Sequence, residues 1–443
     1  MALNVERRAT VHAERDLRAG VARFLRPRGV PASVRRLRGD VALRDALLAT
    51  ACCLVLSAIG GVGAVLIFGA PSNPPGVLHP PGLISGLGSV PDVLVAPFAR
   101  WDSAWYLWTA LHGYGPSGSP PGQFFPLYPL IVFLVSRVGP GVLVAGLLTS
   151  VVATVVGLRL MWKLTDLEFG EAHPDAPRLA VFATALFPTG FFLTAVYPQS
   201  LFLALSIGAM IAARKGRWVW AGVLGGLGAA AHSLGFVIIV PLGLLYLQAK
   251  HWRLRADVLW LALVPAGFGL FMAWLALKGL DPLSPLYAHK TWLRNNTNPF
   301  SGLWLAVRAA WAGVRQIVSQ QSAHVYWVPG IAYGYDAMTT ARDNVEQFVF
   351  LIGAAVAGIA SVCRLPLAYA AYVLALLLVL VSDPIQALPL DGLSRYVAVL
   401  FTVPMMIAWG LSRHPRWRVP VLGASALGLV YFSGSFATWH FVA

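Results

Sequence analysis

Long apolar runs alternate with short polar or charged stretches along most of the chain. A helix that crosses a bilayer needs roughly 20 apolar residues, and the first run of that length covers residues 45–68. Other full-length runs cover residues 142–162 and 258–277, and four more begin near residues 348, 366, 397 and 419. This pattern predicts an all-α polytopic membrane protein with about 11 transmembrane helices.

Two further hydrophobic hairpins, residues 179–213 and 218–247, are each interrupted near the centre. The interruptions extend from Pro188 to Gln199 and from His232 to Gly235, where proline, glycine and polar residues break the apolar pattern. Basic clusters follow each hairpin, at residues 214–217 and 250–255. Because loops rich in lysine and arginine stay in the cytoplasm, both interruptions are expected at the external face.

The same rule divides the chain into a cytoplasmic arm and one membrane domain. Residues 1–44 form an arginine-rich arm that places the amino terminus in the cytoplasm, and residues 45–443 form a single transmembrane domain. Within that domain, residues 69–141 make a first external loop rich in proline and glycine. We expect this loop to carry helices along the membrane surface, at residues 93–111 and 125–138. A second long external segment is expected at residues 279–344.

Composition narrows the class of protein. Hydrophobic residues make up 58% of the 443 residues and charged residues only 12%, with a mean hydropathy of +0.69, which excludes a soluble globular protein. The net charge of +15 is concentrated in short clusters between apolar runs, so it indicates cytoplasmic loops and not nucleic-acid binding. The three cysteines give no disulfide framework or zinc-binding spacing. The bias toward Ala, Gly, Arg and Val favours a bacterial plasma membrane as the location.

Polar residues that cytoplasmic anchoring does not explain gather on the predicted external face. Each could be an ordinary loop or interfacial side chain, but together they indicate a hydrophilic cavity. Asp102 differs from the rest because it lies in an aromatic, membrane-surface stretch, where an unpaired carboxylate is costly and usually functional. Arg100 could be its ion-pair partner. The full set is Arg100, Asp102, His112, Tyr114, Gln123, Tyr197, Gln199, His232, His289, Lys290, Arg294, Asp383, Asp391, Arg395 and Tyr396.

The stretch "RWDSAWYLWTALHGYG", followed by "QFFPLYPL", resembles the first external loop of the GPI mannosyltransferase II (PIG-V) family. Members of that family show R-W-D, G-Y and F-F-P-L-[FY]-P there. Three later stretches support the resemblance, which covers most of the chain between Arg100 and Pro404. They are "LFPTGFFLTAVYPQSLFLALS", "RKGRWVWAGVLGGLGAAAHSLG" and "SRYVAVLFTVP".

The resemblance implies a GT-C glycosyltransferase fold, a polyprenyl-phosphate sugar as donor, and inverting transfer on the external face. It also implies that Asp102 is the catalytic carboxylate and that the sugar is mannose. Two positions depart from the family pattern: Gln199 stands where relatives commonly have Glu, and His232 with Ser233 stands where they commonly have Arg-Pro. Both departures bear on which sugar and which acceptor are used.

The chemistry of inverting transfer assigns roles to the candidate residues. One base takes the proton of the acceptor hydroxyl, which suits Asp102. The leaving lipid phosphate needs cations near the interface, and the candidates are Arg395, Lys290, Arg294 and His232. Arg395 is favoured because "DGLSRY" precedes an apolar run at the external face. The expected substrate-binding residues are Arg100, Trp101, Tyr106, His112, Tyr114, Gln123, Tyr128, Tyr197, Gln199 and Tyr396. Trp101 and Tyr106 could instead be interfacial anchors.

The expected partners are a polyprenyl-phosphate sugar donor, a glycolipid or glycan acceptor, and membrane lipid, with no nucleic acid. No ligand spacing indicates a metal, so we expect no cofactor. Asp102 together with Asp383 or Asp391 is the alternative, as a magnesium or manganese site. A transporter or lipid-linked-sugar flippase without transferase activity is the main alternative function. It would also keep charged groups at an external cavity, but near mid-membrane.

Overall fold

The protein is described here by a computed structural model, which includes residues 32–69, 83–84, 87–115, 122, 124–139, 141–287, 290, 294–323, 325–326, 336–440 and 442. Within these residues the regular structure is entirely helical, apart from an isolated antiparallel bridge between Arg294 and Ile385. The predicted all-α class is therefore confirmed. The predicted arm, residues 1–44, is described only from Ala32 onward, where the first described helix begins.

Five helices in the described part of the chain are long and apolar enough to cross a membrane. Shorter apolar helices pack beside them, and together they make a multi-pass bundle. The five spans are Asp40–Phe68 of α2 (Ala32–Phe68), α6 (Val142–Phe169), Ala256–Leu277 of η4 and α11, α14 (Ala337–Val362) and Pro415–Ala437 of η6 and α18. The shorter helices are α5 (Leu127–Ser136), α8 (Gln199–Arg214), α9 (Trp218–Ala231), α10 (Ile239–Ala249) and α15 (Leu367–Val381).

Both hydrophobic hairpins are interrupted where the sequence predicts. The first hairpin contains α7 (Ala176–Ala185), then the 3-10 turn η2 (Gly190–Leu193), before α8 begins. The second contains α9, which ends at Ala231, and the 3-10 turn η3 (Ser233–Ile238), which leads into α10. The irregular backbone at these breaks is buried inside the protein, which is where non-helical backbone is tolerated at membrane depth.

The predicted second external segment, residues 279–344, contains more helix than its polar composition indicated. It holds α12 (Ser284–Tyr287), α13 (Pro299–Ser319) and the first residues of α14. Small residues explain α13, because one face carries a stripe of glycine and alanine that lies buried against α14. The stripe comprises Gly302, Ala306, Ala309, Ala310 and Gly313.

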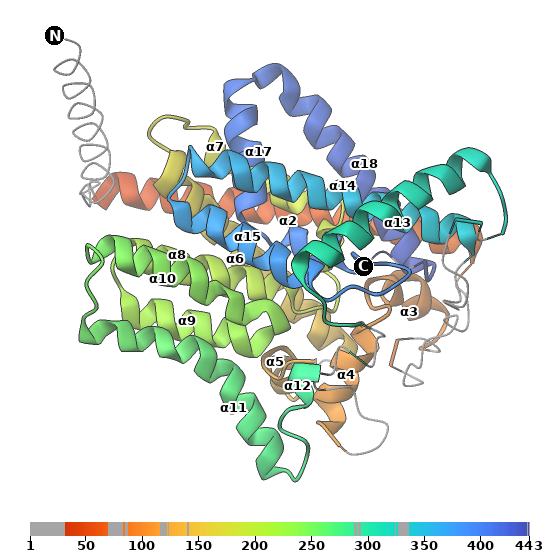
Figure 1. Ribbon diagram of the computed structural model, residues 1–443, viewed down its shortest axis with the longest axis horizontal. Helices are drawn as coiled ribbons and strands as arrows, with labels where there is room; N and C mark the ends of the chain where they lie inside the picture. The colour runs from red at the N-terminus through yellow and green to blue at the C-terminus, as the bar shows by residue number, and fades with distance from the viewer. Residues whose placement is uncertain are drawn as a thin grey trace.

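The segment predicted as the first external loop folds into short helices: α3 (Ser89–Leu94), η1 (Ala96–Phe98) and α4 (Ser103–His112), followed by α5. Near the other end of the chain, α16 (Leu393–Ala398) and α17 (Thr402–Arg413) precede α18. The last helix, α18, packs along the first, α2. Helices α3 and α4 lie at one end of the bundle, opposite the loops that join α8 to α9 and α10 to α11 (Figure 1).

Glycine allows α11 to approach α9 closely. A Cβ added at Gly267 of α11 would lie only 2.0 Å from the carbonyl oxygen of Gly226 of α9, whereas one added at Gly269 would meet nothing within 4 Å. We expect Gly267→Ala to destabilise the protein by roughly 1–3 kcal/mol through overpacking. Gly269→Ala, two residues along the same helix, should leave stability unchanged or slightly raised. Thermal unfolding in detergent compares the two variants, and equal melting temperatures would contradict the close approach.

Candidate functional site

An ion pair between Asp102 and Arg395 lies at the centre of the site. The Arg395 Nη1 donates a hydrogen bond to the Asp102 Oδ2 across 2.8 Å, although the two residues are 293 positions apart. The side chains are 27% exposed for Asp102 and 12% exposed for Arg395. Short bonds between ionised groups are stronger than neutral hydrogen bonds, so this contact fixes the first external loop against α16.

The backbone around Asp102 holds its carboxylate toward Arg395. Trp101 has a left-handed backbone, with φ of +56°, which is rare for a bulky residue. Asp102 follows at the start of α4, and its side chain makes no capping bond to that helix. The Asp102 N–H donates to the Tyr197 hydroxyl (3.1 Å), which in turn donates to the Arg100 carbonyl (3.2 Å). The carboxylate is therefore left for Arg395, near the favourable positive end of the helix dipole.

The first hairpin interruption contacts both halves of the site. Its Val196 N–H donates to the Phe98 carbonyl of the first loop (3.0 Å), and Tyr197 holds the turn at Asp102. On the other side, the Thr189 hydroxyl donates to the Ser394 carbonyl (2.9 Å), next to Arg395. The broken segment thus acts as a common support for the carboxylate and the guanidinium.

Arg395 lies in an aromatic pocket at the first turns of α16. That helix starts after Gly392, whose φ of +79° favours glycine. The Arg395 guanidinium lies 5.2 Å from the ring centre of Tyr396 and 5.6 Å from that of Tyr197, within cation–π range. Its Nη2 donates to the Tyr396 hydroxyl (3.3 Å). Its buried Nε has no hydrogen-bond partner that meets the distance and angle criteria among the described residues.

A second ion pair adjoins the first. Arg294 Nη2 donates to the Asp391 Oδ2 (3.0 Å) and to the Asp391 carbonyl (2.7 Å), while Nη1 donates to the Asp383 carbonyl (3.1 Å). A Cβ at Gly392 would lie 3.7 Å from the guanidinium nitrogens of both Arg294 and Arg395. Burial raises the pKa of Asp391, and the two arginines act against that shift. Two carboxylates and two guanidinium groups therefore share one small region.

His232 and Gln199 line the protein side of this region. The His232 Nδ1 accepts a hydrogen bond from the Leu234 N–H (3.1 Å), and its ring stacks on Phe202 and meets the edge of Tyr396. An Nδ1 that accepts implies a neutral ring with its proton on Nε2. Gln199 is 1% exposed, and its Oε1 has no partner among the described residues.

Arg100 has a structural position instead of pairing with Asp102. It is 2% exposed, and its guanidinium donates to the carbonyls of Ala437 (3.2 Å) and Ile84 (2.9 Å). It also lies 5.0 Å from the ring centre of Trp439. Burial lowers the pKa of Arg100 to about 10, which still leaves it charged at neutral pH. The residue thus ties the first loop to the end of α18, and its substrate-binding role remains a prediction.

Three aromatic candidates lie in the packed wall behind Asp102. Trp101 packs edge-on against Trp439, and Tyr106 packs in the same way against Tyr128 and Tyr197. The Tyr128 hydroxyl bonds to the Gly146 carbonyl and the Ser150 hydroxyl, so its polar atom is already satisfied. These contacts give the three rings a supporting position around the carboxylate.

The remaining candidates are not brought to the ion pair by any described contact. His112 is exposed and stacks on Trp108, and Lys290 is exposed. The Tyr114 hydroxyl donates to the Phe124 carbonyl, while its ring packs on Phe271 and Trp274 of α11. Gln123 and His289 lie outside the described residues.

Sequence reasoning missed three polar residues of α14: Asp343, Asn344 and Gln347. The Gln347 side chain accepts from the Ser394 N–H (2.8 Å) and donates to the Ser394 hydroxyl (3.2 Å), so α14 supports the residue before Arg395. The signal was the polar pattern "RDNVEQ" at the start of an otherwise apolar run. It was read as the end of an external loop.

No three His, Cys, Asp or Glu side chains gather as a metal site among the residues that the structure describes. Asp102 and Asp391, the alternative oxygen ligands, are each paired with an arginine. Both expectations, a reaction without metal and a magnesium or manganese site, therefore stay predictions.

Comparison with known proteins agrees with the first-loop motif. Residues 69–255 match the family described as mannosyltransferase (PIG-V). The chain is 31% identical over 160 residues to GPI alpha-1,6-mannosyltransferase 2 of Rattus norvegicus, covering 33% of this chain and 31% of the relative. It is 29% identical over 179 residues to the Cricetulus griseus protein of that name, covering 38% and 36%.

The matched segments span only about a third of the length of these curated relatives. No solved structure matches the chain. The resemblance to the PIG-V mannosyltransferases is thereby confirmed over residues 69–255, which include Asp102 but neither Arg294 nor Arg395.

The Arg294 contacts predict a structural role that can be measured. We expect Arg294→Ala to destabilise the protein by about 3 kcal/mol, because it leaves the partly buried Asp391 carboxylate without its partner. Lys290→Ala, which removes an exposed cation nearby in sequence, should have no effect. The double variant Arg294→Ala/Asp391→Asn should recover part of the loss, since the stranded charge is gone. Thermal unfolding measures all three, and an Arg294→Ala protein as stable as Lys290→Ala would contradict this role.

Proposed function

We propose that this chain, whose residues 69–255 match the PIG-V mannosyltransferases, is a membrane-embedded mannosyltransferase. It moves a sugar from a polyprenyl-phosphate donor to a glycolipid or glycan acceptor, on the external face and with inversion at the anomeric carbon. The observation that carries the proposal is the Asp102–Arg395 pair, since it sets a carboxylate base beside a cation suited to phosphate.

In the proposed reaction, Asp102 accepts the proton of the acceptor hydroxyl while that oxygen attacks the anomeric carbon. The bond between the anomeric carbon and the phosphate oxygen breaks on the opposite side, and the electron pair leaves with the phosphate. Arg395 stabilises the charge that develops on the leaving phosphate. The charge of Arg395 supports this role, because bonds between a guanidinium and a phosphate are strong.

The ion pair also suggests an order of events. Without substrate, Arg395 neutralises Asp102 and both charges are satisfied. A donor phosphate competes for the same guanidinium, which frees the Asp102 carboxylate to act as base. Donor binding thus activates the base, and an acceptor that arrives alone meets a carboxylate still held by Arg395.

The arrangement of the bundle supports transfer on the external face. The basic loops that join α8 to α9 and α10 to α11 lie at the end opposite α3 and α4 (Figure 1). Loops rich in lysine and arginine favour the cytoplasm, which leaves the end that carries Asp102 outside. The site charges lie at helix ends and in loops, whereas a transporter or flippase would hold them near mid-membrane.

Replacement of the proposed base gives the first test of function. We expect Asp102→Asn to lower kcat by about 100-fold or more, the range of general-base catalysis, with the protein still folded and able to bind donor. Transfer is measured with purified protein and radiolabelled polyprenyl-phosphate mannose. Asp92→Asn is the matched control, because Asp92 lies in the same loop but its carboxylate accepts from the Leu87 N–H. Undiminished transfer by Asp102→Asn would falsify the assignment.

Arg395 gives the second test. Arg395→Ala should raise the donor KM about tenfold or more, because a charge-assisted contact to phosphate is lost, while the protein stays folded. Arg308→Ala, which removes an exposed arginine of α13, serves as control and should leave the donor KM unchanged. Binding of polyprenyl phosphate without sugar separates the phosphate contact from the chemistry. If Arg395→Ala bound polyprenyl phosphate as tightly as the unchanged protein, the role of Arg395 would be rejected.

A further inference from the structure

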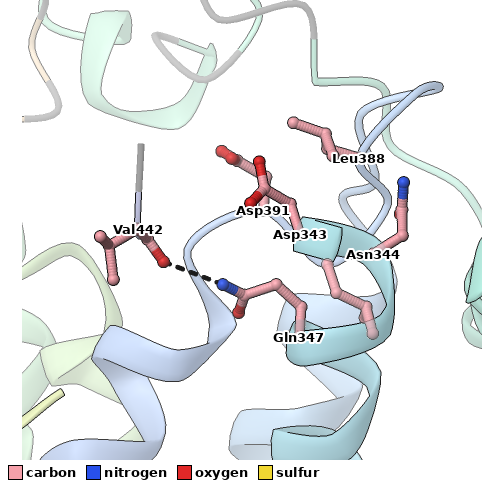
Figure 2. A pocket seen from close by; sticks show the side chains of 7 residues that line it. Asp343, Asn344, Gln347, Leu388, Asp391 and Val442 are labelled. Carbon is pink, nitrogen blue, oxygen red and sulfur yellow. Dashed lines mark hydrogen bonds between the residues drawn. The ribbon is translucent and has the colours of Figure 1, made fainter. Parts of the chain in front are cut away.

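A polar cavity lies beside the charged cluster, on the α14 side of Asp391. It is lined by the first turns of α14, the segment before α16 and the chain after α18, and it encloses about 230 Å³ of space, including its opening to solvent. Figure 2 shows the carboxylates of Asp343 and Asp391 close together within it. The lining residues are Asp343, Asn344, Gln347, Leu388, Leu390, Asp391 and Val442.

The amides in this lining are occupied by the protein itself. The Asn344 Nδ2 donates to the carbonyls of Thr340 and Ala387 (both 2.9 Å). The Gln347 Nε2 donates to the Val442 carbonyl (2.9 Å), as drawn in Figure 2, and its Oε1 accepts from Ser394. In contrast, the buried Oδ2 of Asp343 has no hydrogen-bond partner among the described residues. The cavity therefore presents carboxylate acceptors that a ligand with donors would satisfy.

A second hollow adjoins the first and shares Asp343 and Val442 with it. It encloses about 400 Å³ of space, again including its opening to solvent. Its lining includes hydroxyl, guanidinium, imidazole and carboxylate groups together with two aromatic rings. Its lining comprises Thr339, Arg342, Asp343, Glu346, Tyr431, Phe432, Ser435, His440 and Val442.

The cavity is built onto the same elements as the ion pair. Asp391 lines it and also binds Arg294, and Gly392 and Arg395 follow in the chain. Gln347, another lining residue, holds Ser394, the residue before Arg395. A ligand in the cavity would thus contact residues that hold the segment of Arg395 in place.

We propose that the two hollows bind the hydroxyl groups of the acceptor sugar, with Asp343 and Asp391 as hydrogen-bond acceptors. This inference rests on the proposed transferase function and names the acceptor side of the same site. Neighbouring hydroxyls of a sugar supply paired donors to carboxylates, and the rings of Tyr431 and Phe432 offer an apolar wall. The carboxyl groups set this cavity apart from the donor phosphate beside Arg395, because they offer acceptors to hydroxyl donors.

A divalent cation fits the lining less well. Arg294 already neutralises Asp391, and no group of three potential ligands occurs among the described residues. The cavity also lies at the first turns of α14 and beyond the last turn of α18, both apolar spans. That position is one end of the bundle, where we expect a glycan headgroup to arrive.

Steady-state kinetics of Asp343→Asn test the inference. We expect the acceptor KM to rise about tenfold or more, because hydrogen bonds between the sugar hydroxyls and the Asp343 carboxyl group are lost, while the donor KM and kcat stay near their original values. Asp175→Asn is the control, since Asp175 is exposed and pairs with Arg418 away from the cavity. An unchanged acceptor KM for Asp343→Asn would overturn the proposal.

A binding experiment avoids dependence on catalysis. The full-length Asp102→Asn protein is titrated with methyl α-mannoside and with 2-methoxytetrahydropyran, which keeps the ring but lacks the hydroxyl groups. We expect the mannoside alone to bind, and Asp343→Asn in the same background to weaken it about tenfold. Equal binding of both probes would overturn the proposal. So would Mn²⁺ binding that Asp343→Asn removes, because it would identify a cation site.

The two proposals fail in different ways. If no donor supports transfer but the mannoside still binds through Asp343, the proposed function is wrong and the hydroxyl site stands. If transfer occurs and depends on Asp102 but Asp343→Asn leaves acceptor KM and mannoside binding unchanged, the function stands and the acceptor site is rejected.

Discussion

The contact between Asp102 and Arg395 constrains the rest of the site. Each charge lies beside aromatic rings and is stabilised by the other, and their contact brings α4 and α16 together. Three features help to hold these two helices close: the left-handed turn at Trp101, the hydroxyl of Tyr197 and the broken hairpin. The same contact joins the proposed base to the proposed phosphate-binding cation, so a substrate that engages one would also change the other.

One half of the site lies inside the segment that matches the family, and the other half lies outside it. Asp102, Tyr197 and the first loop lie within residues 69–255, the segment that matches the PIG-V family. Arg395, Arg294 and the α14 cavity lie beyond it. The family match therefore includes one partner of the ion pair and leaves out the other.

Apolar periodicity predicted the helical class, the main spans and both hairpin interruptions, because bilayer thickness sets a length that sequence displays directly. Asp102 and Arg395 were each identified from the sequence as site residues, because each is a charge at the predicted external membrane face. Their pairing was not predicted, because no local pattern relates positions 293 apart. The partners of Arg100 were not predicted for the same reason: the carbonyls that it contacts carry no sequence signature. Helix α13 was missed because its buried face is glycine and alanine, which hydropathy ranks low.

The anchoring of Arg100 has a consequence for biosynthesis. Its guanidinium donates to the carbonyl of Ala437, 337 residues downstream, so Arg100 is made long before its partner. At about 5–20 residues per second, translation takes roughly 17–67 s to cover that distance. The turn that holds Asp102 therefore cannot be completed while the first helices are entering the membrane. Insertion of those helices and completion of the turn become sequential events.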